Sequence, residues 1–179
     1  VPIMDGSAAP FIYLVQEAGI RVQSARRRYL KILQPITLER DDKRIALYPS
    51  DHFKVTYSIS YDHPLLRHQA RTLEITEESF IEQIAPARTF TIYEDIEELI
   101  KLGKIRGGSL DCAIVIKGDK ILSKDPLRFK DEFVRHKILD IIGDVVLLGL
   151  PLKAHIVATR PGHAINADLT KALFQQLQE

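Results

Sequence analysis

The sequence predicts an α+β protein: a layered sandwich of sheet and helices that carries a small βαβ-type insert. Three observations predict it. Period-two alternation of apolar residues, typical of strands, recurs between residues 29 and 75, and a long helical pattern covers residues 131–148. Strand and helix patterns are also largely segregated along the chain, which favours a layered arrangement over a doubly wound parallel sheet.

The first expected element is a short helix from Ser7 to Gly19. Ser7 is placed to act as its N-cap, Pro10 falls in the first turn, and Gly19 suits the position just beyond the helix. The apolar face of this helix would consist of Phe11, Ile12, Leu14, Val15 and Ala18.

A basic connector that contains Arg26, Arg27 and Arg28 follows, and such a run is typical of a solvated linker. We therefore expect a boundary near Ser24. Residues 1–24 would be the C-terminal tail of an upstream domain, and residues 25–179 would form a C-terminal α+β domain. Because the chain begins with Val1 and not Met, we expect a processed protein or a fragment of a longer one.

Strand patterns follow the connector. Alternation predicts strands at Tyr29–Thr37 and Arg44–Tyr48, with a turn at Asp41–Lys43 between them. The clearest strand runs from Phe53 to Tyr61, where apolar and aromatic residues recur at every second position. Two further strands are expected between Leu65 and Ile75.

Helices dominate the remainder of the chain. The long helix is apolar on most sides, so it should be buried. The expected elements are, in chain order, a helix at Thr76–Ala85 capped by Thr76, a helix at Tyr93–Leu102, a small hairpin at Ala113–Ser123, the long helix at Asp131–Leu148, a strand at Lys153–Arg160 and a helix at Ala164–Leu177.

Composition and charge exclude several function classes. The 179 residues include 25 Lys and Arg against 24 Asp and Glu, and this balance argues against a dedicated nucleic-acid binder or a polybasic membrane binder. Cys112 is the only cysteine, which excludes an intramolecular disulfide and fits a reducing compartment such as the cytoplasm. No stretch resembles a signal peptide, and no apolar run approaches the roughly 20 residues of a transmembrane segment.

The long helix carries the most informative polar residues. His136 and Asp140 are four residues apart, so they lie one turn from each other on one helix face, and Asp144 continues the same stripe. A buried histidine and two carboxylates require a cation, and His136 with Asp140 would supply two ligands of a Zn²⁺ site. The spacing by itself is a weak signal for a metal, and it favours a hydrogen bond between His136 and Asp140 or a basic partner.

A second candidate site opens the last helix. His163 follows a strand and stands at a helix N-terminus, where the helix dipole disfavours the protonated ring unless a carboxylate compensates. Asp144 could be that carboxylate, or His163 could serve only as a cap. The glycines at residues 103–108 have neither the spacing of a dinucleotide fingerprint nor that of a P-loop.

Five blocks stand out in order along nearly the whole chain: Ile3–Ala8, Ala87–Phe90, Gly107–Ala113, Leu127–Lys137 and Gly162–Asn166. Together they resemble the UDP-3-O-acyl-N-acetylglucosamine deacetylase family, zinc enzymes of the committed step of lipid A biosynthesis in Gram-negative bacteria. The resemblance implies that His136 and Asp140 are zinc ligands, that His163 is the catalytic histidine with Asp144 as its supporting carboxylate, and that Thr89 bonds the tetrahedral intermediate.

The same resemblance implies a substrate-binding set. Phe90 would lie beside the sugar ring, Lys137 would bind substrate next to the zinc histidine, and Tyr61 would lie against the nucleotide. Lys43 and Arg160 would face the diphosphate. The segment that forms the fatty-acyl passage would contain Ser109, Cys112, Ala113 and Val115, whose small and apolar side chains suit an alkyl chain.

The sequence also departs from the family. The family's upstream domain contributes a glutamate general base and a histidine that is the third zinc ligand, and neither is found here. The resemblance therefore implies one half of a zinc amidase that releases acetate from a UDP-3-O-acyl-N-acetylglucosamine, inactive unless the missing domain is supplied in cis or by another chain. The alternatives are a non-catalytic binding domain for a nucleotide sugar or acyl chain, and a structural domain with a paired His–Asp stripe.

Overall fold

The computed structural model of the chain describes residues 2–101 and 110–176. Its main feature is a six-stranded sheet in which β9 is central, pairing antiparallel with β3 on one side and parallel with β4 on the other. β2 extends the β3 side, β5 extends the β4 side, and the short β1 pairs with the start of β9. The strands are β1 (Leu30–Lys31), β2 (Ile36–Arg40), β3 (Lys43–Pro49), β4 (Lys54–Ile59), β5 (Gln69–Glu74) and β9 (Leu152–Thr159).

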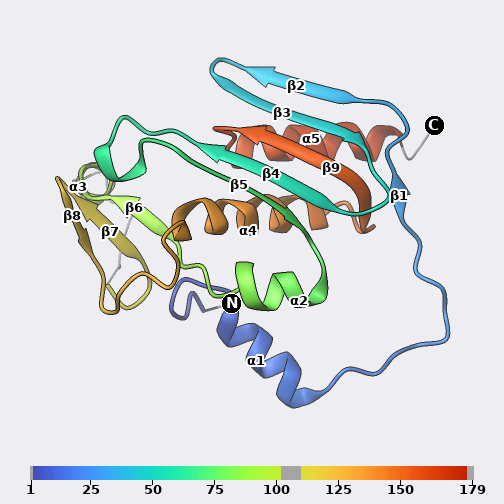
Figure 1. Cartoon of the computed structure of the whole chain (residues 1–179), viewed down its shortest axis with the longest axis horizontal. Coiled ribbons are helices and arrows are strands. Elements are labelled where there is room, and N and C mark those ends of the chain that lie inside the picture. Colours follow the sequence, from blue (N-terminus) through green and yellow to red (C-terminus); the bar gives the residue numbers. More distant parts are fainter. Residues whose placement is uncertain (1, 102–109, 177–179) are drawn as a thin grey trace.

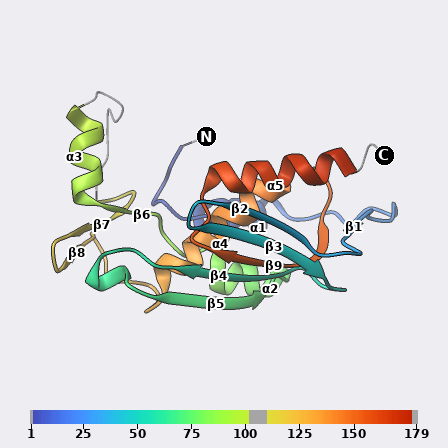
Figure 2. The ribbon, with the colours of Figure 1, turned by 90° about the horizontal axis from the view of Figure 1, so that it is seen from above.

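Two helices cover one face of this sheet. α4 (Glu132–Val146) contacts β4 and β5, and α5 (His163–Gln176) contacts β2 and β3, so the two helices lie side by side behind the strands in Figure 1 and along one side of the sheet in Figure 2. The strands alternate accordingly, with Val55, Tyr57 and Ile59 of β4 buried. The core lies between sheet and helices, and the predicted layered α+β class is confirmed.

The βαβ-type insert is also confirmed. β6 (Phe90–Ile92) runs into α3 (Tyr93–Lys101), β7 (Ile114–Lys117) pairs parallel with β6, and β8 (Lys120–Leu122) returns antiparallel as the expected hairpin. The end of α3 predicted at Leu102 lies outside the described residues. Figure 1 shows this small sheet beside the large one, at the end where α4 begins.

The first helix differs from its prediction. α1 spans Ala9–Ala18, and its N-cap is Ala8, which offers no side-chain bond; Ser7 instead accepts a hydrogen bond from the Ala9 amide at 3.3 Å. Gly19 ends the helix as expected, with φ +78°. No residue of α1 is fully buried, so its apolar face is only partly packed by the described part of the chain.

Two strand predictions were wrong in detail. Tyr29–Thr37 is not one strand: Pro35 separates β1 from β2, because it has no amide hydrogen to donate to a neighbouring strand. The segment from Leu65 to Ile75 holds one strand, not two, since Pro64–Leu66 forms a 3-10 turn whose Leu65 amide donates to the His63 ring.

The helix capped by Thr76 is correct in place but not in type. Thr76 forms a capping box with Ser79, and α2 (Glu77–Ser79) then widens into a π-helical segment, η2 (Phe80–Ile84). Among the described residues, no helix is long and apolar enough to cross a bilayer. The 15 residues of α4 fall short of the about 20 that such a span requires.

Candidate active site

The centre of the candidate site is one edge of α4, where His136 and Asp140 lie one turn apart. Their side chains are 11% and 19% exposed, and Nε2 of His136 is 3.5 Å from Oδ1 of Asp140. Burial lowers the pKa of His136 and outweighs the attraction of the nearby Asp140 carboxylate, so the ring is held in its neutral form. A neutral imidazole beside a carboxylate is the protonation state in which both groups can bind a metal ion.

The tautomer of His136 follows from its other nitrogen. Nδ1 lies 3.0 Å from the carbonyl oxygen of Ala87, and a carbonyl can only accept, so Nδ1 carries the hydrogen. The lone pair of the neutral ring is therefore on Nε2, the nitrogen that faces Asp140. This arrangement does not contain the His136–Asp140 hydrogen bond that the spacing also allowed.

Asp140 has the basic partner that was the other alternative. Lys137 donates from Nζ to Oδ2 of Asp140 at 2.7 Å, while Oδ1 remains directed towards His136. Within the described residues, no third histidine, cysteine or carboxylate joins these two in a cluster that could hold a metal ion. The donor set that the chain presents is thus one imidazole nitrogen and one carboxylate oxygen.

His163 and Asp144 form the second pair of the site. His163 is the first residue of α5, and its Nδ1 donates to Oδ2 of Asp144 at 2.8 Å, since an ionised carboxylate only accepts. Asn166 donates its amide to the same oxygen at 2.9 Å. Asp144 therefore fixes the ring from one side, and Nε2 of His163 is the nitrogen that can exchange a proton with a substrate.

Two of the predicted substrate-binding residues, Tyr61 and Lys137, lie close to the ring of a third, Phe90. The centroid of Phe90 lies 6.0 Å from that of Tyr61 in an edge-on contact and 4.8 Å from that of Phe133. Lys137 places its ammonium group 5.8 Å from the Phe90 centroid. Phe90, Tyr61 and Lys137 thus lie together next to Asp140, to which Lys137 donates, although the sequence separates them by up to 76 positions.

Thr89 is fixed through its backbone. Its amide donates to the Gly6 carbonyl at 2.8 Å and its carbonyl accepts from Ile114 at 2.9 Å. Gly6 has φ +78°, and a Cβ added there would lie 2.1 Å from the carbonyl oxygen of Cys112. Only glycine fits, so the N-terminal segment, Thr89 and Cys112 are locked against one another.

The remaining predicted residues lie in two places. Cys112, Ala113 and Val115 are half-buried at the start of β7, and Ser109 lies outside the described residues. Arg160, with φ +49°, follows β9 and pairs with Asp42 at 2.9 Å, and Lys43 is exposed next to Asp42. These two cations therefore lie at the end of the sheet from which the chain turns into α5.

Sequence reasoning missed two residues that shape this region. Tyr57 is 1% exposed, and its hydroxyl donates to the Pro161 carbonyl at 3.2 Å, just before the turn that carries His163. Burial, reinforced by the charge of Asp140, raises the pKa of Tyr57, so the phenol keeps its proton. Alternation along the strand showed that Tyr57 points inward but could not show its partner. Glu132, the first residue of α4, is the second residue that sequence reasoning missed.

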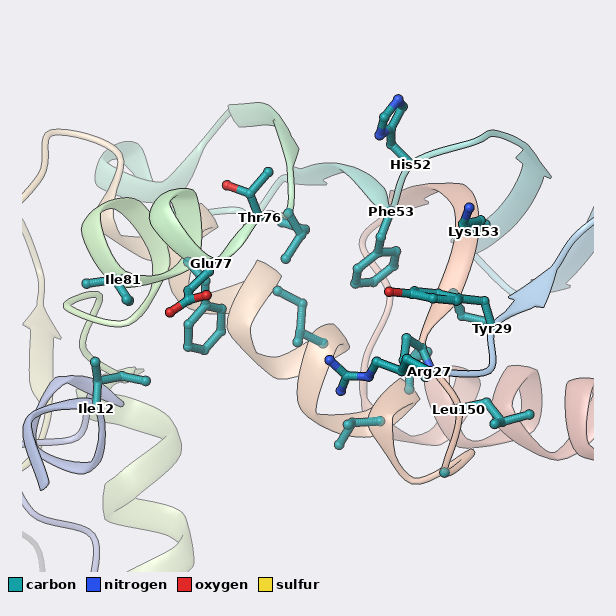
Figure 3. A pocket seen from close by; sticks show the side chains of 18 of the residues that line it. Ile12, Arg27, Tyr29, His52, Phe53, Thr76, Glu77, Ile81, Leu150 and Lys153 are labelled. Atoms are coloured by element: carbon teal, nitrogen blue, oxygen red, sulfur yellow. The ribbon is translucent and has the colours of Figure 1, made fainter. Parts of the chain in front are cut away.

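A groove of about 970 Å³ lies elsewhere, between α1, η2, the end of α4 and the start of β9. Figure 3 shows Ile12, Phe53, Tyr29 and Ile81 around it. None of the predicted site residues lines this groove. The predicted site residues therefore lie outside this groove.

Comparison with known proteins decides the family. The sequence profile of UDP-3-O-acyl N-acetylglycosamine deacetylase matches residues 1–175. The chain belongs to this family. It is 47% identical over 174 residues to the UDP-3-O-acyl-N-acetylglucosamine deacetylase of Syntrophotalea carbinolica, and the match covers 97% of the chain and 56% of that protein.

Two other members of the deacetylase family give the same result. The chain is 47% identical over 174 residues to the deacetylase of an Anaeromyxobacter species, a match that covers 97% of the chain and 57% of that protein. It is 44% identical over 176 residues to that of Acidithiobacillus ferrooxidans, covering 97% and 58%. The chain thus spans somewhat more than half the length of the curated relatives that it matches, and the resemblance drawn from the five sequence blocks is confirmed.

Proposed function

We propose that the protein containing this chain removes the N-acetyl group of a UDP-3-O-acyl-N-acetylglucosamine, releasing acetate, in lipid A biosynthesis. The observation that carries the proposal is the arrangement along one edge of α4. A neutral His136 presents Nε2 3.5 Å from Asp140, and Asp144, one turn further along the same helix, holds His163. Membership of the deacetylase family supports the same reaction.

We include Zn²⁺ as the cofactor. Nε2 of His136 and Oδ1 of Asp140 are of the nitrogen and oxygen types that Zn²⁺ binds, and the carbonyl of Ala87 orients the histidine as a ligand requires. When bound, Zn²⁺ supplies Lewis acidity that polarises the acetyl carbonyl and lowers the pKa of a water molecule.

The third ligand and the general base belong, in our proposal, to the part of the relatives that this chain does not cover. The family resemblance implies an upstream histidine and glutamate for these roles. The exposed helix α1 supports an additional packing partner, because Tyr13, Leu14 and Val15 are 60%, 54% and 50% exposed although they are apolar. The missing region would act in cis or as a separate chain.

This chain's own residues would act on the substrate as follows. His163, oriented by Asp144, donates a proton from Nε2 to the leaving amine. The hydroxyl of Thr89 donates a hydrogen bond to the oxygen that becomes negative as the acetyl carbon turns tetrahedral. Lys137 supplies positive charge beside Phe90, which packs against the sugar ring.

The rest of the substrate would extend to either side. Tyr61 stacks against the nucleotide, and Lys43 and Arg160 neutralise the diphosphate. The fatty-acyl chain passes along the insert, where Cys112, Ala113 and Val115 leave room for it and Ser109 would complete the lining. We place this reaction in the cytoplasm of a Gram-negative bacterium, and a single cysteine fits that reducing compartment.

The test measures acetate release from a UDP-3-O-acyl-N-acetylglucosamine by the full-length protein, before and after chelation and with Zn²⁺ restored. We expect turnover that disappears on chelation and returns with Zn²⁺, and no turnover by residues 1–179 alone. Turnover that survives complete metal removal would reject the zinc mechanism. Hydrolysis by the 179-residue chain alone would reject the assignment of base and third ligand to the missing region.

A further inference from the structure

Glu132, the first residue of α4, is a carboxylate with no exposed surface. It is satisfied by four hydrogen bonds. Oε1 accepts from the amide and from Nε of Arg88, at 3.0 and 2.9 Å, and Oε2 accepts from the amide of Arg128 at 2.7 Å and from Nη2 of Arg88 at 3.3 Å. A charge removed from water in this way requires that its partners stay in place, so Glu132 fixes what it binds.

The segment that Glu132 binds, residues 85–89, precedes β6 and is held by backbone bonds on both sides of the Ala87–Arg88 peptide. The Ala87 amide donates to the Ile84 carbonyl, and Thr89 bonds to Gly6 and to Ile114 of β7. The Pro86 carbonyl accepts from Arg128 at 2.8 Å, and Arg128 also bonds Asp5 at 2.7 Å. Between these backbone bonds, the Ala87–Arg88 peptide group itself is bonded by side chains.

One peptide group of the segment is bonded at both ends by α4. The amide of Arg88 donates to Glu132, and the carbonyl of Ala87 accepts from Nδ1 of His136. These two atoms belong to the same planar peptide group, and Glu132 and His136 are one helical turn apart on the same face. Rotating the peptide plane away from Glu132 would rotate the carbonyl away from His136.

The opposing influence on His136 is Asp140. A carboxylate 3.5 Å from Nε2 attracts a hydrogen to that nitrogen, and this would produce the tautomer in which Nε2 has no lone pair for a metal ion. The Ala87 carbonyl favours the opposite tautomer, but only while its peptide plane is fixed. Two hydrogen-bond acceptors thus compete for one ring hydrogen.

We propose that Glu132 is a positioning residue for the metal-binding half of the site: by fixing the Ala87–Arg88 peptide, it keeps His136 in the Nδ1–H tautomer with the Nε2 lone pair facing Asp140. The use of that lone pair rests on the proposed function; the tautomer itself does not. Glu132 does not contact the substrate in this role.

The experiment compares the wild type with Glu132→Gln in the full-length protein labelled with ¹⁵N-histidine. Long-range ¹H–¹⁵N spectra at about pH 8, where the neutral ring dominates, report the tautomer of metal-free His136, assigned by loss of its signals in His136→Gln. We expect the Nδ1–H form in the wild type and a substantial Nε2–H population in Glu132→Gln. Zn²⁺ affinity should fall by about 10- to 100-fold, the usual effect of losing an outer-shell partner.

Asp131→Asn is the matched control. Asp131 precedes Glu132 and bonds Arg135 and Arg71, not the Ala87–Arg88 peptide. The control should retain the Nδ1–H tautomer and the wild-type Zn²⁺ affinity. If Glu132→Gln does not fold, Glu132→Asp is used instead. It keeps the charge opposite Arg88 but shortens the side chain, and it should give a smaller increase in the Nε2–H population of His136.

The outcomes separate the positioning role of Glu132 from the proposed zinc site. A Glu132→Gln protein that folds and keeps the wild-type tautomer overturns the positioning role, whatever its activity, and so does an equal shift in Asp131→Asn. A wild type that shows the Glu132-dependent tautomer but binds no Zn²⁺ leaves the positioning role intact and rejects the zinc proposal.

Discussion

His136 and His163 lie on adjacent helices, and each is bonded through Nδ1, but their surroundings differ. His136 is 11% exposed and donates to a backbone carbonyl, whereas His163 is 70% exposed and donates to the carboxylate of Asp144. Burial lowers the pKa of His136 and favours the uncharged imidazole, and it outweighs the Asp140 carboxylate and the Ala87 carbonyl, which favour the charged ring. The Asp144 carboxylate orients the His163 ring, and exposure leaves Nε2 of that ring open to a reacting group.

The comparison teaches that the partner of Nδ1, together with burial, assigns each histidine its chemistry. The buried ring is suited to act as a ligand and the exposed ring to act as an acid. If this is correct, substitutions at the two positions should affect different measurements: metal content for His136 and the rate at full metal occupancy for His163.

The largest effect is expected for His136→Gln in the full-length enzyme. Zn²⁺ content should fall to a small fraction of the wild-type value and deacetylation should become undetectable, because one of the two proposed metal-binding atoms of the chain is lost. Metal analysis by mass spectrometry and acetate release measure the two quantities. His155→Gln is the control, since that histidine lies on the sheet face away from the helices and bonds Thr56; it should retain both. Full Zn²⁺ occupancy in His136→Gln would remove the distinction between the histidines.

His163→Gln should reduce kcat by about 10²- to 10⁴-fold, the usual contribution of a general acid or base. Zn²⁺ content should stay at the wild-type value, because Nδ1 of His163 bonds Asp144 and not a proposed ligand. Steady-state kinetics of the Zn²⁺-loaded protein, with metal analysis of the same sample, test this. Loss of the metal together with the rate would show that both histidines act through the metal.

Asn166→Ala should have a smaller effect, lowering kcat about tenfold. Asn166 donates to the same Asp144 oxygen as His163, and a hydrogen bond to a charged group contributes about 1.5–3 kcal/mol. Because Asn166 is buried, thermal unfolding must be followed in parallel. Restoration of the rate by Asn166→Gln, but not by Asn166→Leu, would support orientation of Asp144; equal rates in Leu and Gln variants would contradict it.

The smallest expected effect is the dependence of the free energy of unfolding on pH. The pKa of His136 is lowered in the folded metal-free protein, so as the pH falls the unfolded chain takes up the proton first, near its ordinary value of about 6.5. The free energy of unfolding should therefore fall as the pH drops from about 7.5 through 6.5, by at most about 1.4 kcal/mol per pH unit. Denaturant titrations across this range, compared with His136→Gln, measure it. An identical slope in the variant would assign the dependence to other groups.

The sequence predicted those features of the fold and site that depend on the spacing of residues a few positions apart. The alternation of β4, the long helix α4 and the shared face of His136 and Asp140 all follow from residue spacing. The pairing of His163 with Asp144 was one of two alternatives at that stage, and the structure selects it.

Contacts between distant segments could not be predicted in the same way. The Ala87 carbonyl that sets the His136 tautomer is 49 residues away, and the Tyr57 hydroxyl reaches Pro161 over 104 residues. Neither pattern nor propensity specifies which backbone atom a side chain will meet across a packed interface. The π-helical segment at Phe80–Ile84 also escaped prediction, because its apolar spacing is compatible with an ordinary helix.

The place of β9 in the sheet has a consequence for how the protein is made. β9 is the last of the strands that the structure describes but the middle strand of the large sheet, where it joins β3 to β4. Until residue 159 has left the ribosome, the two hairpins, β2–β3 and β4–β5, have no strand between them. Until then a nascent chain exposes two sets of unpaired strand edges, and pairing over such sequence distances is slow. The large sheet can therefore close only after its central strand has been synthesised.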